Sequence, residues 1–277
     1  MQHSSFEPLP DRGGEIRQVR IAPAFPSRGQ SVEIPWSGST ARRRLVHGFD
    51  SRNASSRSFN LIRSKLVSLR REHGWRMLGV VSATPNVGKS FVSANLGAAL
   101  SRDPRFQTYL IDLDLRRGTI KEIFGIQPDT SIVEYLEESH SGDVLRGYVP
   151  EGQELIIIPS ITAEVHSAEL LAGERATALF RAMRNSDERN FFICDLPPVF
   201  ANDDASIIME SLDGYVIVAQ DGKTTQREIQ ATADMLGRER LAGVVLNKYR
   251  GGLVSEGYGV EDRYAGEYYS NPGADTD

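Results

Sequence analysis

Apolar runs of strand length alternate with helical patterns over most of the chain. The runs lie at positions 77–81, 109–113, 155–158, 191–194, 215–219 and 241–246. Apolar residues recur with helical spacing at positions 89–101, 131–138, 167–185, 202–211 and 224–236. Short runs rich in Val and Ile, with helices between them, are typical of parallel strands buried on both faces. The pattern therefore predicts an α/β fold: a mostly parallel sheet flanked by helices on both faces, with ligands bound beyond the carboxyl ends of the strands.

The chain is predicted to have three parts. Residues 1–57 are rich in Pro, Ser, Gly and Arg and lack regular apolar spacing, which predicts a disordered basic arm. Order is expected from Ser58, where apolar positions at steps of three and four predict an amphipathic helix that ends near His73. The folded domain is accordingly placed at 58–250. A Gly-rich, acidic tail follows at 251–277 and is expected to be flexible.

Composition narrows the range of functions. The chain has 277 residues, 40% of them hydrophobic, and a net charge of −5, so no nucleic-acid partner is expected. Cys194 is the only cysteine, which excludes a disulfide framework and a cysteine-based zinc site. No apolar run approaches the roughly 18–20 residues that span a bilayer, and no hydrophobic signal region is found. A soluble, cytoplasmic protein is therefore expected.

The loop after the first predicted strand has the spacing of a phosphate-binding loop. It reads Ala83-Thr84-Pro85-Asn86-Val87-Gly88-Lys89-Ser90, with Ala in place of the usual first Gly. Here a strand stops, backbone N–H groups wrap an anion, and a helix begins with its positive end toward that anion. Gly88 allows close approach of the backbone, Lys89 supplies a compact charge for the phosphates, and the Ser90 hydroxyl is placed to ligate Mg²⁺.

Acidic residues end two further strands. Asp112 and Asp114 follow the second strand, and on an extended segment two residues of this spacing face the same way. Asp195 ends the fourth strand, as expected for a carboxylate that positions Mg²⁺ in P-loop enzymes. A single Asp often does no more than end a strand. Three of them beside a phosphate loop favour a role in metal binding and in accepting a proton.

Three segments together resemble the bacterial tyrosine kinases (BY-kinases) of exopolysaccharide and capsule assembly, which are P-loop NTPases of the deviant Walker A, partitioning ATPase-like type. Residues 82–90 are similar to that family's Walker A motif, residues 110–117 to its second acidic motif (Walker A′), and residues 192–199 to its Walker B strand. Weaker similarities are found at 168–171 and 243–247. Thr84 stands where the related partitioning ATPases usually have a signature lysine.

The resemblance implies a protein-tyrosine kinase that uses ATP and Mg²⁺. It implies that Lys89, Asp112, Asp114 and Asp195 are the catalytic residues. Asp112 would orient or deprotonate the tyrosine, while Ser90, Asp114 and Asp195 would position the metal. The implied nucleotide contacts are Thr84, Pro85, Asn86, Val87, Gly88, Lys89, Ser90, Phe91 and Asn247. The implied phosphoacceptors, on the tail of a neighbouring copy, are Tyr258, Tyr264, Tyr268 and Tyr269.

The resemblance also implies partners. These are a membrane polysaccharide co-polymerase that acts as an adaptor, a cognate tyrosine phosphatase, and further copies of the chain. The expected role is regulation of polymer synthesis and export at the inner face of the plasma membrane. The family's ring-forming Glu-x-x-Arg-x-x-Arg motif falls on Arg57, Asn60 and Arg63, of which only Arg63 agrees. Ring assembly by this chain therefore stays an open question.

Two other functions fit part of the sequence. One is a regulatory P-loop ATPase that switches its assembly state without phosphorylating protein. The other is a nucleotide-binding scaffold with weak catalysis. Thr84 in place of the signature lysine, and the tyrosines of the tail, argue against the regulatory ATPase. The incomplete match of the helix motif suggests the scaffold, which measurable turnover that is lost on changing Asp112 would exclude.

Overall fold

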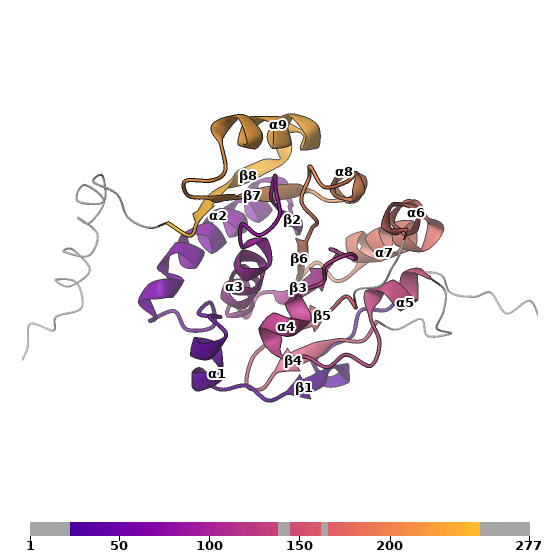
Figure 1. The fold of residues 1–277 in the computed structure, drawn as a ribbon. Coiled ribbons are helices and arrows are strands. Elements are labelled where there is room, and N and C mark those ends of the chain that lie inside the picture. Colours follow the sequence, from indigo (N-terminus) through magenta and orange to yellow (C-terminus); the bar gives the residue numbers. More distant parts are fainter. Residues whose placement is uncertain (1–22, 138–144, 162–165, 250–277) are drawn as a thin grey trace, which may run out of the picture.

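The computed structural model describes residues 23–137, 145–161 and 166–249. Within these ranges the chain forms a sheet of eight strands in the order β1-β4-β5-β3-β6-β2-β7-β8 (Figure 1). The strands are β1 Val32–Ile34, β2 Met77–Val81, β3 Gln107–Asp112, β4 Tyr148–Pro150, β5 Ile156–Ile158, β6 Asn190–Asp195, β7 Gly214–Gln220 and β8 Leu241–Asn247. Every pairing is parallel except that of β4 with β5. The predicted α/β class and mostly parallel sheet are confirmed.

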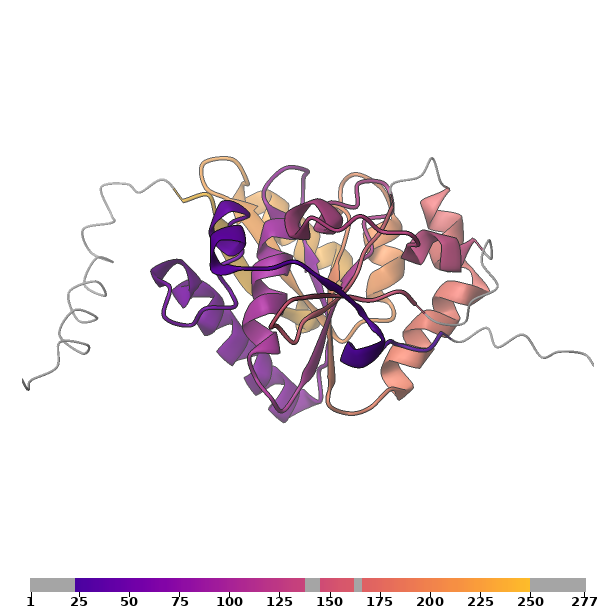
Figure 2. The same ribbon diagram turned by 90° about the horizontal axis from the view of Figure 1, so that it is seen from below.

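Helices cover both faces of this sheet, as Figure 2 shows from below. The α-helices are α1 Gly38–Arg43, α2 Arg57–His73, α3 Lys89–Ser101, α4 Ile120–Phe124, α5 Ile132–Leu136, α6 Ser167–Ala172, α7 Glu174–Asn185, α8 Asp204–Met209 and α9 Gln226–Leu236. Side chains of a strand alternate between two apolar clusters: Leu78 packs with residues of α2 and α3, and Met77 with residues of α7 and α8. Among the described residues, no helix is both long enough and apolar enough to cross a membrane.

The N-terminal segment departs from its prediction. Residues 23–57 contain β1 and α1 (Figure 1). Trp36 and Val46 of this segment are buried in the apolar cluster that also contains residues of α3. The side-chain oxygen of Asn95, on α3, accepts hydrogen bonds from the backbone N–H groups of His47 (2.7 Å) and Gly48 (3.1 Å). The prediction of a disordered arm is therefore wrong for residues 23–57, while residues 1–22 lie outside the described residues.

The prediction fails for residues 23–57 because this segment buries a few isolated side chains and has no periodic apolar face. Trp36 contacts Phe49 and, on α4, Phe124, at ring-centroid distances of 5.9 and 5.4 Å. Such a contact leaves no helical or strand spacing in the sequence. A second difference is that the pattern at 167–185 forms two helices, α6 and α7, which meet at Gly173 in extended backbone.

We predict that Trp36→Ala lowers the free energy of unfolding by about 3 kcal/mol, because it empties a packed aromatic site. Denaturant unfolding measures the change. The control is Leu61→Ala, which removes a side chain that is 70% exposed on α2 and should stay within about 0.5 kcal/mol of the wild type. Equal stability of the Trp36 variant and the wild type would mean that the segment is not part of the folded domain.

Candidate active site

The loop between β2 and α3 curves around an open cleft. Two of its residues have left-handed backbone, Asn86 with φ 63° and Gly88 with φ 92°. A Cβ atom on Gly88 would lie 2.1 Å from the side-chain nitrogen of Asn247, so only glycine fits here. The cleft has a volume of about 400 Å³. Its lining residues are Ser82, Pro85, Asn86, Gly88, Lys89, Ser90, Phe91, Asp114, Arg117, Thr119, Ile123, Pro198 and Lys248.

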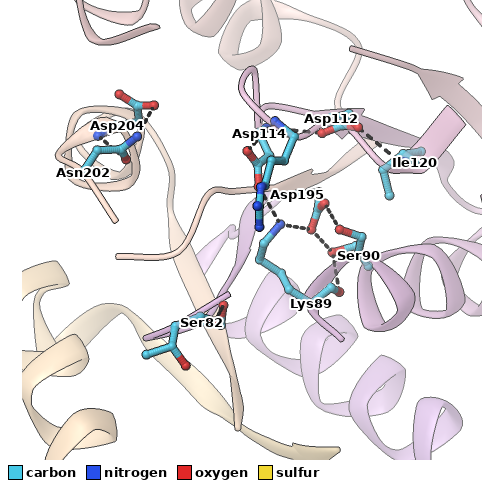
Figure 3. A network of polar contacts seen from close by, with 12 residues as sticks. Ser82, Lys89, Ser90, Asp112, Asp114, Ile120, Asp195, Asn202 and Asp204 are labelled. Carbon is cyan, nitrogen blue, oxygen red and sulfur yellow. Dashed lines mark hydrogen bonds and ion pairs between the residues drawn. The ribbon is translucent and has the colours of Figure 1, made fainter. Parts of the chain in front are cut away.

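The sheet brings the three predicted aspartates together. β3 and β6 are neighbours, and Asp112 and Asp195 are register partners at the carboxyl ends of these strands. β2, which leads into the phosphate loop, pairs with β6 on the side opposite β3. The parallel topology therefore places Lys89 and the carboxyl groups at one edge of the sheet, as Figure 3 shows.

Lys89 lies between two of these carboxyl groups. Its Nζ is 3.0 Å from Asp195 Oδ1 and 3.6 Å from Asp114 Oδ2. Asp195 also accepts hydrogen bonds from Ser90 Oγ (2.6 Å) and from Ser93 Oγ (2.7 Å). Both oxygens of Asp195 are thus held by residues of α3, which fixes this carboxylate against the start of the helix.

Asp112 is held by backbone groups. Its Oδ1 accepts from the N–H of Asp114 (3.2 Å), and its Oδ2 from the N–H of Ile120 (3.1 Å), the first residue of α4. β3 ends at Asp112, so the expectation that Asp112 and Asp114 lie on one extended strand is wrong. The chain turns after Asp112 because its carboxylate bonds the amide two residues on. The turn brings Asp114 to Lys89.

Burial and neighbouring charges shift the pKa values of Asp112, Asp114 and Lys89. Desolvation and the neighbouring Asp195 hold the pKa of Asp112 well above its usual range, and desolvation raises the pKa of Asp114 as well. Burial alone would lower the pKa of Lys89, but Asp195 and the other two carboxylates outweigh it, and the pKa lies above its ordinary value. Lys89 is therefore charged at neutral pH, and Asp112 holds a proton more tightly than an exposed aspartate does.

The donor set at this edge fits Mg²⁺. Ser90, Asp114 and Asp195 offer oxygen ligands beside the cleft. In the described part of the chain no three His, Cys, Asp or Glu side chains form a ready metal site. Mg²⁺ is usually held by one or two carboxylates together with phosphate oxygens and water, and this arrangement allows such a site.

Some of the predicted nucleotide contacts do not line the cleft. Thr84 and Val87 do not line it: the Thr84 carbonyl accepts from Ser82 Oγ (2.9 Å), and Val87 is buried. Asn247 Nδ2 donates to the carbonyl of Val87 (2.8 Å), so this side chain supports the loop. Tyr258, Tyr264, Tyr268 and Tyr269 lie outside the described residues.

Residues 78–264 match the sequence profile of the CobQ/CobB/MinD/ParA nucleotide binding domain. The match extends over more than half of the chain and includes the loop and all three aspartates. The chain belongs to this family.

The relatives of this nucleotide-binding domain include tyrosine kinases. It is 28% identical to tyrosine-protein kinase CpsD of Streptococcus agalactiae, over 74% of this chain and 90% of the relative. It is 29% identical to tyrosine-protein kinase ptk of Acinetobacter johnsonii over 62% of this chain, but it spans only 23% of that longer relative. The kinase domain of Escherichia coli tyrosine kinase ETK superposes with a TM-score of 0.63 at 24% identity, covering 80% of this chain and 90% of that one. The resemblance to the BY-kinases is thus confirmed.

Sequence reasoning missed two polar residues of the site. Ser93 lies one turn into α3, where a serine carries no motif signal, and only the fold brings it to Asp195. Lys248 follows β8 with φ 57°, and its Nζ donates to the carbonyl of Asn86 (2.6 Å). A lysine directly after Asn247, a predicted site residue, was a signal that could have been used.

We predict that Gly88→Ala weakens ADP binding by at least about tenfold in a calorimetric titration with Mg²⁺, equivalent to about 1.4 kcal/mol. The added methyl group displaces Asn247 and strains a left-handed residue. Gly243→Ala in β8 is the matched control, because its Cβ meets no atom within 4 Å. Unchanged affinity in the Gly88 variant would exclude the loop as the nucleotide site.

Proposed function

We propose that this domain transfers the γ-phosphoryl group of ATP to tyrosine hydroxyls, chiefly those at Tyr258, Tyr264, Tyr268 and Tyr269 on the tail of another copy. The observation that carries the proposal is the position of Asp112, a buried carboxyl group with a raised pKa. It is the register partner of Asp195, whose carboxylate lies 3.0 Å from the ammonium of Lys89, a residue of the phosphate loop. Phosphoryl transfer requires mostly positioning and charge, and these residues supply both.

Each residue has a separate role in this proposal. Backbone amides of the loop and the Lys89 ammonium bind the phosphates and offset negative charge. Ser90, Asp195 and Asp114 hold Mg²⁺, which neutralises phosphate charge when bound. Asp112 orients the tyrosine hydroxyl and accepts its proton, for which a raised pKa is an advantage.

The setting of the reaction is also proposed. Relatives of the domain are named tyrosine-protein kinases, and we infer that the chain acts in regulating exopolysaccharide or capsule polymerisation and export. Its partners would be a membrane co-polymerase adaptor, a cognate tyrosine phosphatase and further copies of the chain, at the inner face of the plasma membrane. Each phosphate adds about −1.5 to −2 charges to a tail that is already acidic, which favours dispersal of assembled copies.

The direct test is phosphotyrosine formation by the purified chain with ATP and Mg²⁺. We expect Asp112→Asn to reduce the rate about a hundredfold, because general base catalysis contributes at least this much. Mixing wild-type chain with a Lys89→Met chain should label the Lys89 variant, since its tail is intact.

Two outcomes would contradict the proposal. ATP hydrolysis without phosphotyrosine would identify a regulatory ATPase instead. An Asp112→Asn chain that labels tyrosine at the wild-type rate would remove Asp112 from the mechanism.

A further inference from the structure

A second polar cluster lies at the same edge of the sheet, outside the nucleotide cleft. Asp204, at the start of α8, is buried, and its Oδ2 accepts from Ser167 Oγ (2.7 Å) and from Asn202 Nδ2 (2.9 Å). Ser167 in turn accepts from Arg116 Nε (2.7 Å), and the same nitrogen is 3.5 Å from Asp204 Oδ2. Figure 3 shows Asn202 and Asp204 to one side of the group formed by Lys89 and the three aspartates.

The two consecutive arginines after Asp114 therefore diverge. Arg117 lines the nucleotide cleft, whereas Arg116 extends to the residues that begin α6 and α8. The Arg116 side chain is 52% exposed although its Nε is held by a buried network. A guanidinium that is fixed at one nitrogen and open to solvent elsewhere loses little side-chain entropy when it binds a carboxylate.

The tail carries a matching pattern. A carboxylate stands two residues before three of the four proposed acceptor tyrosines, in Glu256-Gly257-Tyr258, Asp262-Arg263-Tyr264 and Glu267-Tyr268-Tyr269. In an extended peptide, residues two apart project from the same face and lie about 7 Å apart. A tyrosine that enters the site toward Asp112 therefore turns its preceding acid toward the enzyme as well.

We propose that Arg116 binds the carboxylate two residues before the acceptor tyrosine, and that Asp204 and Ser167 are positioning residues that hold Arg116 in place. The ligand is an extended acidic peptide, the tail of a second copy of this chain. This inference rests on the proposed kinase function and specifies which tyrosines it selects.

The test measures trans-phosphorylation between two forms of the full chain. The enzyme has its four tail tyrosines changed to Phe, and the acceptor carries Lys89→Met so that it cannot label itself. One acceptor variant, E256Q/D262N/E267Q, removes the acids that stand two residues before a tyrosine. A matched acceptor, E261Q/D275N/D277N, removes three acids at other tail positions, so the change in tail charge is the same.

We expect the first acceptor to be labelled about tenfold more slowly than the unmodified tail, and the matched acceptor within about twofold of it. With an Arg116→Ala enzyme the two variant acceptors should be labelled at equal rates. Asp204→Asn should reduce the difference in part. Arg71→Ala is the control enzyme: its side chain is 79% exposed on α2, and the difference should persist.

A merely structural role for Arg116 would slow labelling of every acceptor and leave their ratio unchanged, which would overturn the inference. Equal loss for both acid-depleted acceptors would overturn it too, because it would show that only total charge matters. Absence of phosphotyrosine on every acceptor, the unmodified tail included, is instead the failure of the proposed function.

Discussion

The buried charges at the carboxyl ends of the strands are the constraint on which the active site depends. One ammonium group, on Lys89, faces the carboxyl groups of Asp112, Asp114 and Asp195, and all four residues are less than a tenth exposed. With every carboxyl ionised, the group has an excess of two negative charges, which is costly in a desolvated place. A divalent cation beside Ser90 would offset this excess.

The scaffold explains why these residues meet. β6 lies between β3 and β2, so Asp195 is the register partner of Asp112 and stands beside the strand that leads to Lys89. Backbone amides of Asp114 and Ile120 then hold Asp112. After the same turn, Arg117 lines the nucleotide cleft and Arg116 lies beside Asp204. The residues that follow β3 therefore contact both the nucleotide cleft and the proposed binding site of the acceptor peptide.

The sequence predicts the parts of the structure that repeat or carry a motif. The six strands predicted from the sequence, β2, β3 and β5 to β8, are continuous apolar runs, and Gly88, Lys89 and Ser90 form a recognisable tripeptide. The segment around Trp36 was assigned wrongly because its buried side chains fill single gaps beside α4 and follow no period. The roles of Ser93 and Asp204 could not be predicted for a related reason. Each depends on partners that only the fold brings near, and Ser93 and Asp195 are about 100 residues apart in the sequence.

The most direct test of this account is the dependence of ADP affinity on Mg²⁺, measured by calorimetry for the wild type and for Asp195→Asn. If the excess negative charge repels phosphate until a divalent cation binds, Mg²⁺ should tighten ADP binding by the wild type at least about tenfold, and the variant should lose most of this gain. Wild-type affinity that is the same with and without Mg²⁺ would contradict the account.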